Sequence, residues 1–360
     1  MSSSDTAARP ASTMDEAKLN AFIGKGVGDI GAAISSCMIL LGDRLGLYKA
    51  LAKRPLTPAE LAQETRTSER YVREWCANQA AGGYLTYLGA SGRYALEPEQ
   101  AFCLADPDSP IFFPGAYDVV AATFHALGKA EANFRSGRGM DWGEHHQCLF
   151  HGTEKFFRAN YIGNLITSWL PALDGVVDKL RHGARVADVG CGHGASTILM
   201  AASFPASTFV GFDNHGPSIE TARTRARDAA LANVTFEVAS STTFAGTYDL
   251  IACFDCLHDM GDPVGAAQHV RTALAADGTW MIVEPFAGDS VAENLNPVGR
   301  VFYAASSMIC VPASLAHGGP ALGAQAGEAT LKQVIVAGGG FTRFRRATQT
   351  PFNLVLEARP

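Results

Sequence analysis

The sequence predicts an α/β fold: a Rossmann-like domain with a seven-stranded sheet, preceded by a mostly helical domain. Between residues 185 and 283, short apolar strands alternate with helical patterns, which is typical of a doubly wound parallel sheet. The last two strands, 341–347 and 351–358, are too close together for a helical crossover, so they form an antiparallel hairpin. The N-terminal part instead shows helical periodicity followed by one small hairpin.

Each strand of the parallel part is a short apolar segment followed by polar residues or glycines. Five such strands are expected, at 185–189, 208–213, 234–238, 248–254 and 279–283. Ligands of open α/β sheets bind outside the carboxyl ends of the strands, so the residues that follow each strand are the candidates for a binding site.

The N-terminal part has the signals of a winged helix. Thr57, Pro58 and Glu60 have the spacing of a capping box with proline at the first helical position. Apolar residues recur three and four apart before this point, and a two-stranded wing follows. The expected elements are helices over 17–51, from 57, and from 67 or 68 to 81, and strands over 84–88 and 94–96.

These patterns divide the chain into four parts. We expect a disordered tail at 1–16, a winged-helix dimerisation domain at 17–103, a helical linker and substrate cap rich in aromatic residues at 104–175, and the α/β domain at 176–360.

Composition excludes several classes of function. The chain of 360 residues has a formal charge of −6, which gives no long-range attraction to nucleic acid or to an anionic membrane. Its eight cysteines show no paired framework, which indicates free thiols in a reducing compartment. The apolar run 30–41 is too short to span a bilayer, and the residues before it have the composition expected of a disordered tail and not of a signal peptide. We therefore expect a soluble cytoplasmic protein.

Winged helices often bind DNA, but the charges of this one argue against it. Two acidic and two basic residues on the third helix nearly cancel: Glu69, Arg70, Arg73 and Glu74. The first helix carries Ile34, Met38, Leu40 and Leu41, which suits a dimer interface. The sequence thus predicts a homodimer and no nucleic-acid partner.

The first strand of the α/β domain leads into alternating glycines. Asp188 precedes Gly190, Gly192 and Gly194, so the backbone turns tightly beside a carboxylate. Such a loop accommodates a flat nucleoside with a cationic tail, which indicates S-adenosylmethionine. The same residues also match the dinucleotide pattern G-x-G-x-x-G/A, but a carboxylate at this turn would repel a pyrophosphate.

Further donor-binding residues are expected at the following strand ends. Asp213 can accept hydrogen bonds from both ribose hydroxyls, and Ser240 lies where it could contact the amino group of the adenine. The complete expected set for the cofactor is Asp188, Gly190, Cys191, Gly192, Gly194, Asp213, Asn214, Ser240, Phe254 and Asp255.

A histidine and a glutamate follow the last two parallel strands. His258 could take the proton of a hydroxyl that attacks the donor methyl group. Glu284 could hold the other ring nitrogen of this histidine. A histidine satisfied by capping contacts is the structural alternative for the same pair.

The helical linker supplies the expected substrate pocket, namely Trp142, His145, His146 and Tyr161. His145, His146, His151 and His258 could also suggest a metal, but no cysteine or carboxylate spacing completes a zinc pattern. No metal site is expected.

At the level of motifs, the chain resembles class I S-adenosylmethionine-dependent methyltransferases with an N-terminal winged-helix dimerisation domain, a bacterial group typified by mycobacterial small-molecule methyltransferases. The motifs are 188–194, 254–263 and 296–300. The chain is also similar to plant-type O-methyltransferases, in which a general-base histidine precedes an aspartate, as in His258-Asp259. It departs from that family at Met260, Ser240 and Phe254, where Trp, Asp and Lys are usual.

The resemblance implies transfer of a methyl group from S-adenosylmethionine to a small-molecule hydroxyl, with His258 as general base and S-adenosylhomocysteine as product. Two other functions stay open: a winged-helix regulator that binds a ligand without catalysis, and an NAD-dependent oxidoreductase. The sequence does not identify the methyl acceptor or decide among oxygen, nitrogen and carbon as the methylated atom.

Overall fold

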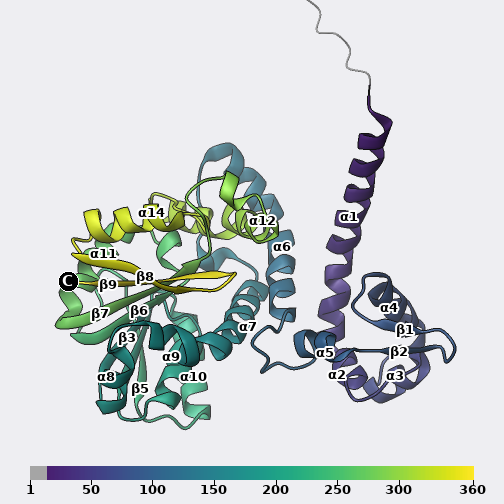
Figure 1. Cartoon of the computed structure of the whole chain (residues 1–360), viewed down its shortest axis with the longest axis horizontal. Coiled ribbons are helices and arrows are strands. Elements are labelled where there is room, and N and C mark those ends of the chain that lie inside the picture. Colours follow the sequence, from purple (N-terminus) through teal and green to yellow (C-terminus); the bar gives the residue numbers. More distant parts are fainter. Residues whose placement is uncertain (1–13) are drawn as a thin grey trace, which may run out of the picture. The chain divides into compact units, whose positions relative to one another are not determined.

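A computed structural model describes residues 14–360, so most of the predicted tail lies outside the described residues. The chain divides into two compact units, one ending at Gln100 and the other beginning at Ala101 (Figure 1). The helical linker predicted at 104–175 therefore falls in the same unit as the α/β sheet.

The first unit is a winged helix, as predicted. A long helix, three shorter helices and a two-stranded antiparallel sheet follow one another, and a further helix crosses the boundary between the units. In order they are α1 (Glu16–Arg44), α2 (Leu47–Leu51), α3 (Pro58–Thr65), α4 (Glu69–Ala81), β1 (Thr86–Leu88), β2 (Arg93–Ala95) and α5 (Pro98–Leu104). The single helix predicted over 17–51 is wrong, because Gly46 adopts φ of 70° and separates α1 from α2.

Buried aromatic side chains hold these helices together. Tyr48 of α2 packs edge-on against Trp75 of α4, with ring centroids 5.2 Å apart. The indole nitrogen of Trp75 donates to the carbonyl of Met38, 2.8 Å away, and the Tyr48 hydroxyl donates to Gln79. The buried hydrogen-bonding groups of this core are therefore paired with each other across three helices.

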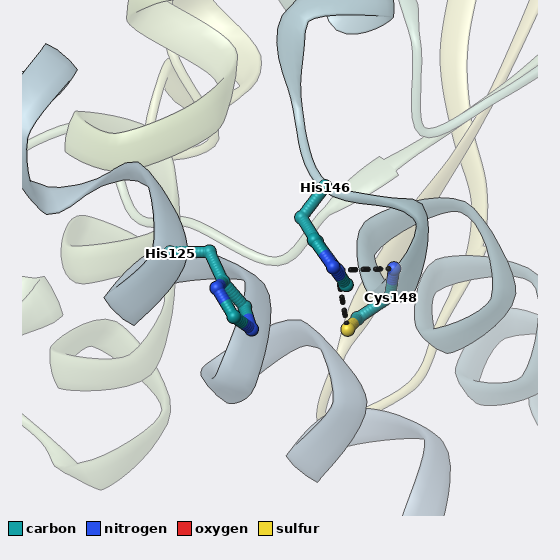
Figure 2. A group of neighbouring side chains, drawn as sticks. All are labelled: His125, His146 and Cys148. Atoms are coloured by element: carbon teal, nitrogen blue, oxygen red, sulfur yellow. Dashed lines mark hydrogen bonds between the residues drawn. The ribbon is translucent and has the colours of Figure 1, made fainter.

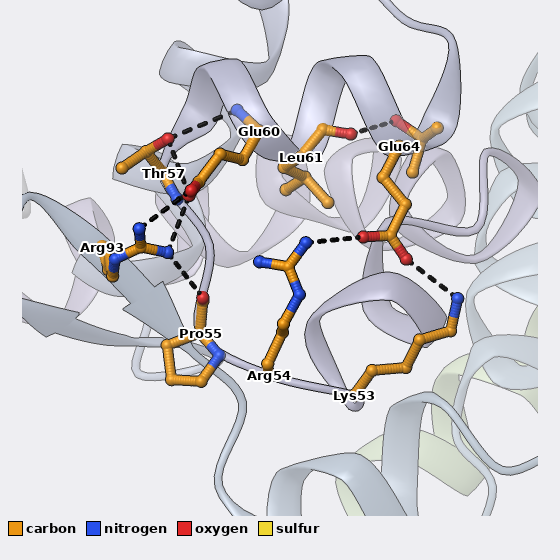
Figure 3. Close-up of polar contacts among 9 residues, drawn as sticks. Lys53, Arg54, Pro55, Thr57, Glu60, Leu61, Glu64 and Arg93 are labelled. Carbon is orange, nitrogen blue, oxygen red and sulfur yellow. Dashed lines mark hydrogen bonds and ion pairs between the residues drawn. The ribbon is translucent and has the colours of Figure 1, made fainter.

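The predicted capping box is present and also anchors the wing (Figure 3). Glu60 accepts from the backbone N–H of Thr57 at 2.8 Å, and its two carboxylate oxygens accept from Arg93 of β2 at 2.7 and 2.8 Å. The Thr57 N–H and the Arg93 guanidinium together lower the pKa of Glu60 to about 2. One carboxylate thus joins the start of α3 to the hairpin.

Helix α1 exposes a row of apolar side chains. Ile23, Val27, Ile30, Ile34 and Leu41 are all more than two-fifths exposed, and they follow one another along the helix at steps of four, three, four and seven residues. By length and apolar composition, two helical segments of the described chain could cross a membrane: Glu16–Arg44, mostly exposed, and Pro297–Ala316, nearly half buried. The cytoplasmic location stays a prediction.

The second unit is built on the predicted seven-stranded sheet. The strand order is β5-β4-β3-β6-β7-β9-β8; the first five are parallel, and β9 and β8 are antiparallel (Figure 1). The strands are β3 (Arg185–Val189), β4 (Thr208–Asp213), β5 (Val234–Val238), β6 (Tyr248–Phe254), β7 (Leu274–Pro285), β8 (Arg343–Gln349) and β9 (Asn353–Arg359). The predicted fold class is confirmed, including the C-terminal hairpin.

Helices cover both faces of this sheet and create two apolar cores. On one face, Met200 and Ile219 are fully buried; on the other, Val270 and Leu331 are. The helices of the first face are α8 (Val176–His182), α9 (Ala195–Ser203) and α10 (Gly216–Asp228), and those of the second are α11 (Pro263–Ala273) and α14 (Gly327–Lys332) (Figure 1).

The remaining helices of the second unit lie near the carboxyl ends of the strands. Helices α6 (Pro114–Ser136) and α7 (Gln147–Asn164) pack against each other, with a short 3-10 helix, η1 (Trp142–Glu144), between them in the chain. Helix α12 (Pro297–Ala305) and the π-helical turn η6 (Ser306–Cys310) pack beside α6 through Ala122, Phe302 and Ile309, and helix α13 (Val311–Ala316) follows directly. The chain order reverses direction between β3 and β6, and a crevice is expected at this point.

Candidate functional site

A cavity of about 460 Å³ lies at the carboxyl ends of the parallel strands, where α7, η1 and α13 also reach. This volume is in the range of small-molecule sites. The predicted site residues on its wall are Trp142, Tyr161, Gly190, Cys191, Gly192, Asp213, Asn214, Ser240, Phe254 and Asp255. The predicted residues that do not line it are His145, His146, Asp188, Gly194, His258 and Glu284.

The glycine loop forms one side of the cavity. The backbone N–H groups of Gly190 and Cys191 donate to the carbonyl of Phe212 at 2.8 and 3.0 Å, which fixes the loop against β4. Gly190 and Gly192 have φ of 78° and 51°. A Cβ on Gly192 would meet nothing within 4 Å, so the loop backbone is open to a ligand at this residue.

Asp213 ties the end of β4 to this loop. One carboxylate oxygen accepts from the N–H of Gly192 at 2.9 Å and the other from the N–H of His215 at 2.8 Å. Burial raises the pKa of this carboxyl above its ordinary value, although both hydrogen bonds act to lower it. Each oxygen keeps a second lone pair with which it could accept from a ligand hydroxyl.

Asp188 is buried under the loop and does not line the cavity. One of its carboxylate oxygens accepts from the hydroxyls of Ser196 and Thr197, both at 2.6 Å, and the other has no partner in the described part of the chain. Burial raises the pKa of Asp188 to about 6. The predicted direct contact with a ligand is therefore replaced in this structure by contacts to the first turn of α9.

Asp255 follows β6 in a backbone conformation that is rare for an aspartate, with φ of 51°. One carboxylate oxygen accepts from the side-chain amide of Asn353 at 2.9 Å. The other is buried at the cavity wall and has no partner among residues 14–360. Burial, and then the charge of Glu284, raise the pKa of Asp255 well above its ordinary value. A cationic ligand group beside Asp255 would stabilise the ionised form of this carboxyl.

His258 and Glu284 form the predicted pair, but away from the cavity surface. The ring nitrogen Nδ1 of His258 lies 2.5 Å from a Glu284 oxygen, and the other oxygen accepts from the N–H of Leu257 at 2.9 Å. The His258 side chain is 3% exposed. Burial acts to lower its pKa, but the Glu284 carboxylate and the Cys310 thiol outweigh burial, so the pKa of His258 lies well above its ordinary value.

The neighbouring Asp259 does line the cavity. One of its oxygens accepts from the indole N–H of Trp142 at 3.1 Å, which joins η1 to the end of β6. Burial raises the pKa of Asp259 to about 6, although the positive charge of His258 acts to lower it. From the sequence, a contribution of Asp259 to catalysis stayed open, since no local pattern shows where its side chain points.

The two adjacent histidines predicted for the substrate pocket point elsewhere. His145 ends the η1 turn and is buried, with its Nε2 unpaired within the described residues. His146 is the exposed N-cap of α7 and accepts from the N–H of Cys148 at 3.2 Å. The capping box of Asp141 and Glu144 sets this turn, so Trp142 faces the cavity while both histidines face away from it.

The cavity wall is acidic. It carries five carboxylates, Glu154, Asp213, Asp255, Asp259 and Asp262, and none of its described residues is Lys or Arg. Glu154 is paired with Arg225 at 2.8 Å, and the buried His258 acts on Asp255 and Asp259. The wall also includes Phe150, which stacks on His215 with ring centroids 5.0 Å apart. Phe150 belongs to the aromatic linker predicted to cover the pocket, whereas no sequence pattern pointed to His215, which follows β4 and meets α7 only in the folded chain.

The fold and this cavity define a chain with a winged-helix domain followed by a Rossmann-like domain whose ligand site lies at the strand ends. Residues 180–314 match the family model of a methyltransferase domain, and residues 32–106 match that of an Rv2258c-like winged HTH domain. The chain therefore combines a winged HTH domain with a methyltransferase domain.

One curated relative is trans-aconitate 2-methyltransferase of Variovorax paradoxus (strain S110), 35% identical over 109 residues. The match covers 29% of this chain and 40% of that protein. This chain thus spans well under two thirds of the relative's length.

Solved structures resemble almost the whole chain. Human N-acetylserotonin methyltransferase in complex with SAM has a TM-score of 0.67 at 17% identity, covering 97% of this chain and 99% of that one. An O-methyltransferase family protein from Burkholderia thailandensis has a TM-score of 0.67 at 16% identity, with the same coverage. The mitomycin 7-O-methyltransferase has a TM-score of 0.65 at 20% identity, covering 96% of this chain and all of that one. These similarities show the fold.

Proposed function

We propose that this chain transfers a methyl group from S-adenosylmethionine to a hydroxyl of a small molecule, with S-adenosylhomocysteine as the other product. The observation that supports it most directly is the acidic wall beside an open glycine loop. S-adenosylmethionine carries a sulfonium and an ammonium group, and a wall of carboxylates without Lys or Arg favours such a cation. The solved relative from human is described in complex with SAM.

The residues present fit this donor. The backbone of Gly190, Cys191 and Gly192 would contact the donor, because the loop is open to the cavity at these residues. Asp213 would accept from the ribose hydroxyls, and the unpaired oxygen of Asp255 would face a cationic group. Asp188 would act indirectly, by holding the first turn of α9 through Ser196 and Thr197. The donor supplies an electrophilic methyl group when bound.

The same wall disfavours a nicotinamide dinucleotide. A pyrophosphate needs backbone N–H groups at a helix N-terminus without competing negative charge. Here the N–H of Gly192 already donates to Asp213, and five carboxylates line the cavity. We therefore propose no oxidoreductase activity.

Direct binding measurements test this choice. In calorimetry with the full chain, we expect S-adenosylmethionine and S-adenosylhomocysteine to bind and NAD not to bind. The variant Asp213→Asn removes one charge but keeps an acceptor, so the affinity for both nucleosides should fall while the protein stays folded, as circular dichroism can check. Binding of NAD, or no binding of S-adenosylmethionine at millimolar concentration, would contradict the proposal.

The methyl acceptor we propose is uncharged or cationic and carries an aromatic or apolar ring. Trp142, Phe150, Phe157 and Tyr161 line the cavity together with the carboxylates. These rings would contact a flat acceptor and exclude water, whereas an anionic acceptor would be repelled. Oxygen is the proposed methylated atom because several structural relatives are named as O-methyltransferases.

Two side chains are candidates for the general base. His258, with Glu284 holding its Nδ1, has the paired arrangement of a base and an orienting carboxylate. It is buried, however, and its ring must become accessible before it can reach a hydroxyl. Asp259 lies on the cavity wall with a pKa of about 6, which suits a base near neutral pH. We propose His258 as the base and treat Asp259 as its competitor.

A regulator that binds DNA through the winged helix is disfavoured by the ion pairs of α4. Arg70 pairs with Glu74 at 2.6 Å, and Arg73 pairs with Glu69, all on the exposed side of the helix. A helix whose basic side chains are paired with its own carboxylates offers little net positive charge to a phosphate backbone.

We also propose that the first helix mediates a homodimer. The exposed residues Ile23, Val27, Ile30, Ile34 and Leu41, together with Cys37, follow the alternating four- and three-residue spacing of a coiled-coil seam. A second copy of the helix presents a complementary apolar row and would cover this one.

Light scattering on the full chain tests the dimer. Wild type should have the mass of two chains, and Ile30→Asp should shift the protein to monomer because it places a charge in the seam. Ala21→Asp is the matched control. Ala21 lies nine residues before Ile30, and at about 100° per residue this places it on the opposite side of the helix. The Ala21→Asp variant should therefore remain a dimer. A monomeric wild type would contradict the proposal. So would a wild type that sediments together with lipid vesicles in a vesicle-binding assay.

A further inference from the structure

Three side chains with metal-binding atoms face one another at the surface of the second unit, outside the cavity (Figure 2). His125 lies on α6, and His146 and Cys148 lie at the start of α7. Their ligand atoms are all within 4.8 Å of one another. None of the three lines the cavity of the proposed methyl transfer.

We propose that His125, His146 and Cys148 form a zinc-binding site. Imidazole nitrogen and thiolate sulfur are ligands that Zn²⁺ prefers, and three protein ligands leave the fourth position of a tetrahedral site for water. A tetrahedral zinc ion holds its nitrogen and sulfur ligands about 3.4 to 3.6 Å apart. The ligand atoms here lie within 4.8 Å of one another, so they are near these separations. Because the two imidazole rings are stacked, one of the two exposed rings must first turn out of the stack for both nitrogens to point at one ion.

The backbone already holds the three residues in place. His146 is the N-cap of α7: its Nδ1 accepts from the N–H of Cys148 at 3.2 Å and lies 2.8 Å from the Cys148 sulfur. The rings of His125 and His146 are stacked, with centroids 4.1 Å apart and planes 13° from parallel. The Nδ1 of His146 is engaged by the cap, so its Nε2 is the nitrogen that we assign to the metal.

Helix α6 also contacts the segment that precedes α7. One turn further along α6, Lys129 donates to the carbonyl of Glu144 at 3.0 Å and to its carboxylate at 3.2 Å. Ala122 and Ala126 of α6 are buried on the neighbouring positions of this helix. A metal ion would thus add a second link between α6 and the start of α7.

Such a link has a structural consequence for the cavity. Helix α7 carries Phe150, Glu154, Phe157 and Tyr161, which form part of the cavity wall. Zinc at its N-terminus would fix the first turn of the helix that carries them. We therefore assign the ion a stabilising role and no contact with the substrate.

Sequence patterns predict no metal, because no cysteine or carboxylate spacing completes a zinc pattern with His145, His146, His151 and His258. The fold brings His125, 21 positions earlier in the chain, beside His146. The three residues do not have the spacing of a zinc motif in the sequence. They meet because two helices pack together, so no sequence motif predicts this site.

Cobalt, a spectroscopic substitute for zinc, tests the site directly. Full-length protein freed of metal by chelator dialysis should bind one equivalent of Co²⁺ with a sulfur-to-cobalt charge-transfer band in the near ultraviolet, and Zn²⁺ should displace it. Cys148→Ser should lose the band, and His125→Ala should weaken binding at least about tenfold. The control His182→Ala, at an exposed histidine of α8, should bind as wild type does.

Thermal unfolding supplies a second readout that needs no methyl donor. Zn²⁺ should raise the Tm of wild type and leave that of Cys148→Ser unchanged, since a ligand that binds only the folded state stabilises it. Equal Tm values for the two proteins without metal would show that the variant folds. Absence of the charge-transfer band in wild type, or its persistence in Cys148→Ser, would overturn the proposal, whatever the outcome of the nucleoside-binding experiments.

Discussion

Replacing His258 with alanine should lower kcat by about 10² or more while leaving the affinity for S-adenosylmethionine nearly unchanged. The physical reason is that proton removal from the acceptor hydroxyl would be lost, whereas the glycine loop and Asp213 that we propose hold the donor are untouched. Steady-state kinetics and calorimetry on the same variant measure the two effects separately.

The matched variant is Asp259→Asn, which keeps the size of the side chain and an acceptor for the Trp142 indole. If His258 is the base, this variant should lose much less activity than His258→Ala. A larger loss in Asp259→Asn, with His258→Ala near wild type, would transfer the role of base to Asp259.

The pH dependence distinguishes the two bases as well. A base acts in its deprotonated form, so activity should rise with pH through its pKa in either case. For His258 this rise should lie well above pH 6.5, because the Glu284 carboxylate stabilises the protonated ring. Glu284→Gln removes that charge, so the rise should move to lower pH. If Asp259 is the base, activity should rise near pH 6, and Glu284→Gln should shift that rise only slightly.

The second large effect is expected at Gly194, the N-cap of α9. Gly194→Ala should lower the free energy of unfolding by about 2–5 kcal/mol, through left-handed backbone strain and overpacking together. Gly194 has φ of 77°, and a Cβ there would lie 2.7 Å from the Phe236 ring and 3.0 Å from the Ala222 Cβ. Both neighbours belong to the buried core on that face of the sheet, so they cannot move away freely.

Gly192→Ala is the control for this prediction. Its φ is also positive, at 51°, but a Cβ there would meet nothing within 4 Å. Only the backbone strain applies, so its loss of stability should be about 1–2 kcal/mol. Urea denaturation of the two variants measures the difference; equal stability of Gly194→Ala and Gly192→Ala would show that the Phe236 contact costs nothing.

Much of the fold could be predicted from local sequence patterns. The strands at Arg185–Val189, Thr208–Asp213, Val234–Val238 and Tyr248–Phe254 lie where apolar runs end in polar or glycine residues. The capping box of Thr57 and Glu60 is likewise formed by residues three apart. These features depend on neighbours within one or two turns of chain, so periodicity and spacing suffice to predict them.

The first helix shows where such patterns fail. Apolar residues continue at helical spacing through Leu51, but Gly46 adopts a positive φ and separates α1 from α2. A glycine is compatible with either a continuous or a broken helix, and the packing of Leu47, Tyr48 and Leu51 into the core favours the break.

By itself, the sequence determined the order of the elements, the parallel sheet with its antiparallel hairpin, and the glycine loop at the end of β3, because each rests on residues close together in the chain. Only the tertiary structure decided which side chains share a surface. It turns Asp188 toward Ser196 and Thr197 and buries His258 with Glu284. It also places Asp259 on the cavity wall and His125 beside His146 and Cys148. The direction of a side chain depends on rotamers and on helices packed from distant parts of the chain, which no local spacing records.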